Sequence, residues 1–459
     1  MKQLAIILAM ALVTAFAYPI SLEESVSHAM EHNRELLMAR ERVAIADLAH
    51  QEIRGSFLPQ ISLSGGYSLT KTYLPDSALP SPVDLTLGIN PATASDNDYY
   101  LAGAISGIAN SLIPVSPLDE GALGLSLKLE QILFSGGQLH YGAKALERYK
   151  EVQRLNYEAT RRELTLQTTK LFYSYLLADE LVGVQDEALA TAESHLARVE
   201  AFAAEGMVAE FDLLRAKLEV AKLKPQLLQA QNTRELALAA FRTLIGDQDG
   251  TAIPEGGFPL PKEIGISEQE AIERGLSARP EIMMARTGTK IKELMWKSEK
   301  GTLLPKLGLQ ASASVYTAAD EFAIENDDFG TSYAIGIGVS VPLFTGLKSL
   351  ARTRAAKHEY LLARLQTQDY EDKISLEITQ CLQKLRFAEE NLKVQEKNIE
   401  MAERGLQLAQ VRYENQVGIQ LEVFDARTIL SAMKLQYFQA VYDVIAASCE
   451  FKKAIGEDL

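Results

Sequence analysis

Three carboxylates occupy positions from which they could attract cations. Glu422 and Asp425 are three residues apart in a stretch of helical composition, which places both on one face of a helix. Asp212 matches Glu422 in an earlier, similar stretch, at an offset of 210 residues. A narrow ring of such carboxylates, contributed by several chains, would focus negative potential and favour cations. The alternative is structural, because negative charge in the first turns of a helix complements its macrodipole by about 0.3–1 kcal/mol.

The segment "HAMEH" (residues 28–32) indicates a different chemistry, since it fits the H-x-x-E-H signature of zinc peptidases. Histidines four residues apart on a helix can face one metal ion. The residues aligned with His28 and His32 later in the chain are Arg274 and Ala278, so the pair is not repeated. No third ligand can be assigned, and two solvated histidines on a helix face are the favoured interpretation. We expect no metal, no cofactor and no enzymatic activity.

Composition and the N-terminus limit the class of protein. The 459 residues carry a net charge of −15, which disfavours nucleic acid as a partner. Lys2 precedes a short apolar run that ends in Ala15-Phe16-Ala17, the pattern of a secretory signal peptide. We therefore expect residues 1–17 to be cleaved and the chain to be exported. The sequence has no G-x-x-x-x-G-K-[ST] motif for nucleotide binding, so any process that needs energy would depend on a partner.

The chain is an internal duplication. "LFSG" at 133–136 recurs as "LFTG" at 343–346, and the same offset of 210 matches residues 125–246 to 335–456. Upstream of the strands the offset is 246, because the first copy has an insertion rich in proline between about residues 70 and 120. The sequence thus predicts a first repeat at 18–246, a linker at 247–266 and a second repeat at 267–456.

Each repeat is expected to contain a helix, two strands and a pair of long helices. Segments with an apolar face and a small or polar face alternate over about ten residues, which is typical of strands in a membrane barrel. Each returning strand is followed by an uninterrupted helical pattern of roughly 67 residues, or about 100 Å, and by a turn and a second helix. A first helix is expected at 21–54 and a loop at 71–119. Strands are expected at about 57–70, 120–134, 303–316 and 332–344, and long and return helices at about 136–203, 209–245, 347–413 and 419–455.

Four strands in one chain cannot close a barrel. Unpaired backbone groups at an open sheet edge cost several kcal/mol each in hydrocarbon, so several chains must share a barrel. Two chains would give eight strands, whose interior side chains fill, whereas three give twelve and leave a pore. We expect a homotrimer with a shared 12-stranded barrel in contact with membrane lipid. Gly136 and Gly346 would allow the bend from strand to helix, next to Phe134 and Phe344 at the edge of the apolar band.

At this point the chain resembles the TolC-type outer-membrane efflux proteins over essentially the whole mature sequence. The motifs that carry the resemblance are the duplicated "LP" before the outgoing strand, "LF-[ST]-G" after the returning strand, "G-x5-D" from Gly206 to Asp212, and "LEVFDA" at 421–426. The resemblance implies a trimeric channel with a twelve-stranded barrel in contact with outer-membrane lipid and an α-helical tunnel through the periplasm. It also implies docking to a periplasmic adaptor protein and an inner-membrane transporter.

The resemblance also assigns roles to the helical tips. Acidic residues that match Glu422 and Asp425 form a cation-selective constriction in such channels, and Asp212 is the aligned candidate. The tips around Gly206, Met207, Val417 and Gly418 are expected to dock the adaptor and to gate the entrance. The substrate could be a drug, a metal ion or a polypeptide. The rival interpretation is a periplasmic coiled-coil scaffold without a pore, which would not need four amphipathic strands.

The two cysteines leave two alternatives open. Cys381 and Cys449 lie equally far from a turn near residue 415, so an antiparallel hairpin would place them at the same height. They could form a disulfide in an oxidising compartment, or pack as two small apolar residues between helices.

Overall fold

The structure is a computed structural model that describes residues 18–71, 84–89, 95–111, 119–260, 265–319, 329–415 and 417–458. The expected signal peptide and parts of the expected loop and linker lie outside these residues. The chain divides into two compact units. One comprises residues 1–51, 141–297 and 351–459, and the other comprises residues 52–140 and 298–350.

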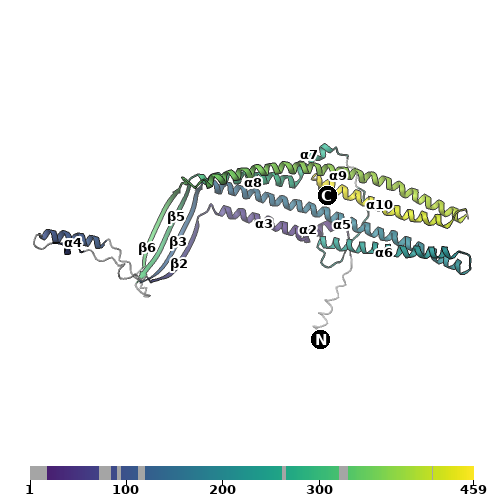
Figure 1. Cartoon of the computed structure of the whole chain (residues 1–459), viewed down its shortest axis with the longest axis horizontal. Coiled ribbons are helices and arrows are strands. Elements are labelled where there is room, and N and C mark those ends of the chain that lie inside the picture. The colour runs from purple at the N-terminus through teal and green to yellow at the C-terminus, as the bar shows by residue number, and fades with distance from the viewer. Residues whose placement is uncertain are drawn as a thin grey trace, which may run out of the picture. The chain divides into compact units, whose positions relative to one another are not determined.

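Two antiparallel helical hairpins dominate the first unit (Figure 1). In the first hairpin, Lys224 pairs with Glu193 at 3.3 Å and Arg234 with Asp179 at 3.2 Å. In the second, Lys384 pairs with Glu450 at 2.7 Å. The helices and short strands are β1 (Tyr18–Ile20), α2 (Leu22–His32), α3 (Arg34–Gly55), α5 (Gln138–Ala204), α6 (Glu210–Ile245), β4 (Ala252–Pro254), α7 (Glu268–Ala278), α8 (Pro280–Lys300), α9 (Lys348–Glu414) and α10 (Gln420–Ala454).

The core of this unit repeats the duplication in its packing. Phe241 and Phe451 are aligned at the offset of 210, and both are 0% exposed. Each return helix is followed by a glycine in the left-handed region, Gly246 at φ 77° and Gly456 at φ 79°. A Cβ on Gly246 would meet the backbone of His32 at 2.9 Å, and a Cβ on Gly456 would meet Ala278 Cβ at 2.8 Å. Both repeats therefore close the same contact between a return helix and a short N-terminal helix.

The first helix expected at 21–54 is in fact two helices, and the break falls at Asn33. Its Oδ1 accepts hydrogen bonds from the backbone N–H groups of Glu35 (2.9 Å) and Leu36 (3.2 Å), which makes it the N-cap of α3. Its Nδ2 donates to the carbonyl of Leu244 on α6 at 2.9 Å. The break thus depends on a tertiary hydrogen bond, which helix propensity does not reveal.

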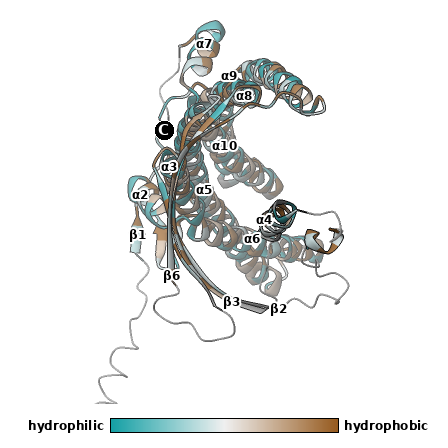
Figure 2. Ribbon diagram, turned by 90° about the vertical axis from the view of Figure 1, so that its left-hand side faces the viewer, coloured by the Kyte–Doolittle hydropathy of each residue, from teal (hydrophilic) through white to brown (hydrophobic). Residues whose placement is uncertain are grey.

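The second unit is built on one antiparallel sheet of order β2-β3-β5-β6, which curves along its length (Figures 1 and 2). Within the repeats, Gln60 faces Glu130 and Lys306 faces Ser340. The second pair is the first pair shifted by 246 and 210 residues, so the duplication preserves the strand register without a slip. The strands are β2 (Gln60–Lys71), β3 (Asp119–Ser135), β5 (Lys306–Ala319) and β6 (Phe329–Ser340).

The two "LF" motifs have different secondary structure. Phe134 lies within β3 and faces Leu307 of β5 after a bulge. Phe344 is outside β6, which ends at Ser340 rather than at the expected residue 344. Pro342 has no backbone N–H to donate, and β6 is an edge strand of this sheet. The ladder of hydrogen bonds therefore does not extend beyond Ser340.

The expected loop at 71–119 contains two described helices. They are the 3₁₀ helix η2 (Leu85–Gly88) and α4 (Asp96–Ser111), joined by a hydrogen bond from the Leu85 N–H to Ser106 Oγ at 2.9 Å. Within the part of the chain that the structure describes, no helix combines the length and apolarity needed to cross a membrane.

Candidate functional site

The tip of the second hairpin is a short turn stabilised by its own backbone. The N–H groups of Val417 (2.9 Å) and Gly418 (3.0 Å) both donate to the carbonyl of Arg412. Arg412 also pairs with Glu422, with Nε and Oε2 3.6 Å apart. A Cβ on Gly418 would lie 3.0 Å from that same carboxylate oxygen. Glu422 therefore closes the turn in addition to any role at a pore.

The structure does not bring the three predicted carboxylates together within one chain. Glu422 and Asp425 lie in the first two turns of α10, and Asp212 lies in the first turn of α6. Asp425 and Asp212 are exposed, whereas Glu422 is half-buried. Among the described residues, no hydrogen bond or ion pair links any two of the three. A ring of these carboxylates thus requires further copies of the chain.

The tip of the first hairpin turns at Gly206, whose φ is 72°. The N–H of Met207 donates to the Phe202 carbonyl at 2.9 Å. Large apolar side chains are exposed at both tips: Met207 is 65%, Phe211 70%, Val417 73% and Ile419 62% exposed. Exposed apolar side chains on two neighbouring turns are suited to contact with another protein.

The structure also contains a cationic cluster near the tips, which the sequence analysis did not predict. It consists of His195 and Arg198 on α5 and Arg427 on α10. Burial, and then the charges of Arg198 and Arg427, hold the pKa of His195 below its usual value of 6.5. Burial and Arg198 likewise lower the pKa of Arg427. The sequence does contain a usable signal. Arg198 aligns with residue 408, and residues 408 and 427 are about equally far from the second turn, so Arg198 and Arg427 are expected at the same height along their helices.

The lowered pKa of His195 predicts a dependence of stability on pH. The unfolded chain takes up this proton more readily than the folded chain, so the free energy of unfolding should fall as pH drops below about 6.5. We expect the denaturant midpoint to fall from pH 8 to pH 5, and to fall less in His195→Gln. His358→Gln, at an exposed position of α9, is the control and should behave as wild type. An identical pH dependence in His195→Gln would contradict the assignment.

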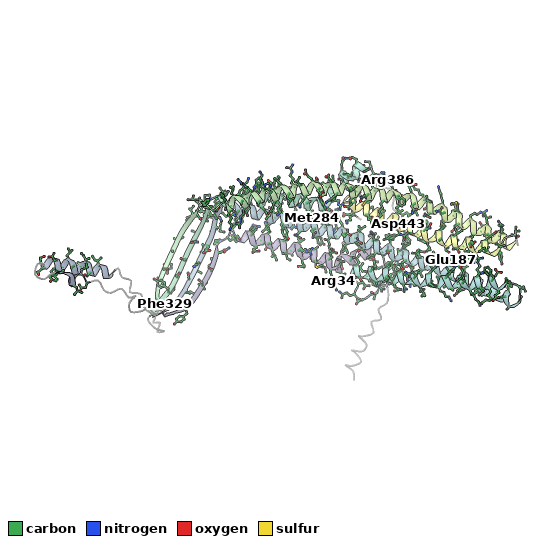
Figure 3. The ribbon with its side chains drawn as sticks, in the orientation of Figure 1. Arg34, Glu187, Met284, Phe329, Arg386 and Asp443 are labelled. Atoms are coloured by element: carbon green, nitrogen blue, oxygen red, sulfur yellow. The ribbon has the colours of Figure 1, made fainter. Side chains whose placement is uncertain are left out.

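Uncharged side chains, six of them apolar and eight polar, line a cavity of about 700 Å³ among α5, α6, α9 and α10. Close to its Gln185, the carboxylate of Glu187 accepts a hydrogen bond from Lys434 Nζ at 2.9 Å (Figure 3 labels Glu187). This contact joins α5 of the first repeat to α10 of the second. The residues that line the cavity are Ala178, Leu181, Gln185, Pro225, Gln226, Gln229, Ala230, Thr233, Asn391, Gln395, Leu435, Gln436, Gln439 and Ala440.

The histidines of the H-x-x-E-H segment have structural partners. His28 Nδ1 lies 3.0 Å from the carbonyl of Ile245, and His32 Nδ1 lies 3.1 Å from the carbonyl of His28. Their rings stack with centroids 4.2 Å apart. Among the described residues, no group of three or more His, Cys, Asp or Glu side chains could hold a metal ion. The geometry favours a contact between α2 and the end of α6.

Cys381 and Cys449 are free thiols in this structure. Both are half-buried and pack against the apolar core. Burial raises the pKa of each thiol, which makes the reactive thiolate scarcer.

The strand-to-helix joints differ between the repeats. Gly136 (φ 65°) is buried against the backbone of Gly301, where an added Cβ would lie 2.2 Å from the Gly301 oxygen. Gly346 has nearly the same φ, 62°, but a Cβ there would meet nothing within 4 Å. The residue aligned with Gly301 in the first repeat is Gly55, and its Cβ would also meet open space. The contact between Gly136 and Gly301 is thus made within the chain. The aligned residues, Gly346 and Gly55, make no such contact within it.

Two long helical hairpins, a four-stranded sheet with β2 and β6 at its edges, and exposed apolar tips are features suited to one segment of a channel wall. Comparisons with known proteins agree. The sequence model of the outer membrane efflux protein family matches residues 25–247 and 271–457. The chain belongs to this family, whose members are efflux channels rather than enzymes.

Individual relatives are distant in sequence but similar along their length. The chain is 23% identical over 430 residues to the outer membrane efflux protein BepC of Brucella suis, covering 93% of this chain and 83% of the relative. It is 23% identical over 444 residues to the solvent efflux pump outer membrane protein SrpC of Pseudomonas putida, with the same coverage.

Solved structures share the fold. The outer membrane channel CmeC of Campylobacter jejuni matches with a TM-score of 0.77 at 18% identity, over 95% of this chain and 85% of that one. The outer membrane protein VceC of Vibrio cholerae matches with a TM-score of 0.74 at 16% identity, over 95% and 96%. The protein is therefore an outer-membrane component of an efflux system, and it serves as the exit duct.

Proposed function

We propose that three copies of the chain close a twelve-stranded barrel in the outer membrane and continue as a helical tunnel in the periplasm. The observation that carries this proposal is the conserved register of the duplication. Because β3 pairs with β5 inside the chain, β6 of one copy is expected to pair with β2 of the next in the same way. Closure removes the two open edges that a lone sheet would present to lipid.

We further propose that the tips form the gated entrance. Three copies bring Asp425, Glu422 and Asp212 to one mouth, where like charges focus potential on passing cations. The pair between Arg412 and Glu422 stabilises the turn that carries this ring. The exposed apolar tip residues, with Gly206 and Gly418, supply the surface for a periplasmic adaptor, and an inner-membrane transporter drives transport. Opening then is a shift in population that partner binding favours.

Removing the charges should change ion selectivity. In planar bilayers, Glu422→Gln/Asp425→Asn is expected to lose most of the preference for cations, and Asp425→Asn alone should lose part of it while the turn stays intact. Asp212→Asn tests the third member of the ring. The control is Glu396→Gln, an exposed carboxylate of α9 far from the tip. Reversal potentials equal to wild type in the double variant would remove the proposed role. The absence of any conductance in the wild type would favour the scaffold interpretation.

A further inference from the structure

The start of α9 carries a concentration of positive charge that the exit-duct function does not explain. Residues 341–357, here called the basic joint, contain four basic residues and no acidic residue. The whole chain, by contrast, has 61 acidic and 46 basic residues. The four basic residues of the joint are Lys348, Arg352, Arg354 and Lys357.

These four cations are exposed, and most of them have no counter-ion. Within the described part of the chain, Lys348, Arg352 and Arg354 form no ion pair. The start of α5 differs, because the cations just beyond the aligned stretch (131–147) are paired: Arg148 with Glu151 at 2.7 Å and Lys150 with Asp47 at 2.6 Å. Unpaired cations on a helix that follows an apolar strand are free to contact an anionic surface.

Apolar side chains directly precede the cations. Leu343 is 93%, Phe344 81% and Leu347 66% exposed. In the first repeat, the aligned Leu133 and Phe134 stay 45% and 47% exposed even though β5 lies beside them. A neighbouring copy packed against β6 in the same way would thus leave about half of Leu343 and Phe344 uncovered. The joint therefore presents an apolar patch next to a basic patch.

Leu347 adds a backbone observation. It is the one non-glycine residue with positive φ (65°) among the described residues, and the aligned residue in the first repeat is Gly137 at φ 85°. A leucine is disfavoured in this left-handed conformation. Here it faces solvent rather than a core, so no packing within the described chain compensates for the strain.

Aromatic side chains lie a few turns further along α9. Trp296 of α8 stacks on Tyr360 of α9, with ring centroids 5.9 Å apart and planes at 10°. Lys357 Nζ lies 6.0 Å from the centre of the Trp296 ring. Trp and Tyr beside basic residues are characteristic of the boundary between lipid and water.

We propose that the basic joint binds the headgroups of acidic phospholipids in the leaflet that borders the periplasm. The apolar residues Leu343, Phe344 and Leu347 contact the acyl chains, and the cations of α9 contact lipid phosphates. This inference rests on the proposal that the sheet lies in the outer membrane. It goes beyond that proposal because it names a lipid class and a location.

The first repeat provides an internal comparison. At the positions aligned with the four cations it has Gln138, Gly142, Lys144 and Glu147. The first two are uncharged, and the charges of Lys144 and Glu147 cancel. A trimer would therefore carry three acidic-lipid sites, one per chain, which alternate with three joints of low net charge. The lipid contact belongs to the second repeat alone.

The test measures lipid binding to the full-length trimer reconstituted in nanodiscs of phosphatidylethanolamine with a minor fraction of phosphatidylglycerol. We expect the wild type to enrich phosphatidylglycerol in its lipid shell, and to lose this enrichment at high salt. Lys348→Gln/Arg352→Gln/Arg354→Gln should lower the affinity on the order of 100-fold, since each cation near an anionic surface contributes about fivefold. Lys144→Gln/Arg148→Gln/Lys150→Gln, which removes three cations from the start of α5, should retain the enrichment.

Two further variants separate charge from folding. Lys348→Arg/Arg352→Lys/Arg354→Lys keeps the charge and should bind as wild type. Leu347→Gly restores the residue of the first repeat, and should keep the trimer intact while weakening lipid retention severalfold.

Two outcomes would overturn the proposal. One is an equal affinity of the wild type for phosphatidylglycerol and phosphatidylethanolamine. The other is displacement of the lipid by soluble acidic peptidoglycan fragments at equal concentration, which would assign the cations to a different anion. A wild-type trimer that conducts ions but shows no lipid preference would contradict the lipid proposal and not the proposed trimeric channel. A chain that forms no trimer would contradict both proposals.

Discussion

Gly55→Ala is expected to leave the chain folded and to prevent closure of the trimer. In the isolated chain, a Cβ on Gly55 meets nothing within 4 Å. The aligned residue of the second repeat, Gly301, packs against Gly136, and a Cβ there would lie 2.3 Å from the Gly136 oxygen. If the duplication also governs the contact between copies, Gly346 of one copy lies against Gly55 of the next. The added methyl group then meets backbone, which cannot move aside without breaking the joint.

Oligomeric state and cross-linking measure this effect. We expect Gly55→Ala to migrate as a monomer by light scattering in detergent, with wild-type circular dichroism. Gly288→Ala is the matched control, because Gly288 also faces open space, in the interior of α8, and alanine there only favours the helix. A trimeric Gly55→Ala protein would contradict the proposed contact.

The same symmetry fixes one residue pair between copies. Ser126 and Ser314 face each other across β3 and β5, with their hydroxyl oxygens 3.0 Å apart. The residues aligned with them are Gly336 and Ser68, which lie on the two open edges of the sheet. Gly336→Cys/Ser68→Cys should therefore form a disulfide between copies, and Gly55→Ala should abolish it. The slipped pair Ile337→Cys/Ser68→Cys should not cross-link, because its side chains are on opposite faces.

Phe241→Ala is expected to lower the free energy of unfolding by about 3–5 kcal/mol, the usual cost of deleting a fully buried phenylalanine. Phe241 is 0% exposed and packs edge-on against Phe172 with ring centroids 6.2 Å apart. It lies where α6 meets α5, so the cavity would loosen the first repeat at its core. Denaturant unfolding followed by circular dichroism measures the change.

The control lies on the same helix. Leu236→Ala removes a side chain that is 71% exposed, and should change the free energy of unfolding by less than about 1 kcal/mol. Phe451→Ala, at the aligned position of the second repeat, is 0% exposed in the wild type and should cost as much as Phe241→Ala. Equal effects of Phe241→Ala and Leu236→Ala would show that this core does not limit stability.

Much of the fold could be predicted because its signals are periodic and occur twice. The alternation in both repeats indicated four strands, and a single offset aligned residues that occupy equivalent places in the core, such as Ile245 and Ile455. Features that depend on a single tertiary contact could not be predicted from the sequence. The break at Asn33 needs the carbonyl of Leu244, and the early end of β6 depends on Pro342 and on its edge position.

The candidate site was harder to predict, because its parts come from different copies and different hairpins. Glu422 and Asp425 could be placed on one helix face by spacing, but the contact of Glu422 with Arg412 depends on the geometry of the turn. Residues equally far from a helical turn lie at the same height, as Cys381 and Cys449 do. The same rule, combined with the offset of 210, places Arg198 and Arg427 at similar heights. No spacing rule indicates that the partly buried Arg427 will lie within the electrostatic influence of another arginine, the exposed Arg198.

The pairing of β3 with β5 has a consequence for how a closed ring is made. Of the six seams between repeats in a trimer, three are formed inside single chains. Strands tethered in one chain meet at an effective concentration on the order of millimolar, so these seams need no diffusional encounter. Assembly then requires three bodies to meet instead of six. The fusion of two repeats thus makes ring closure less dependent on the amount of protein delivered to the membrane.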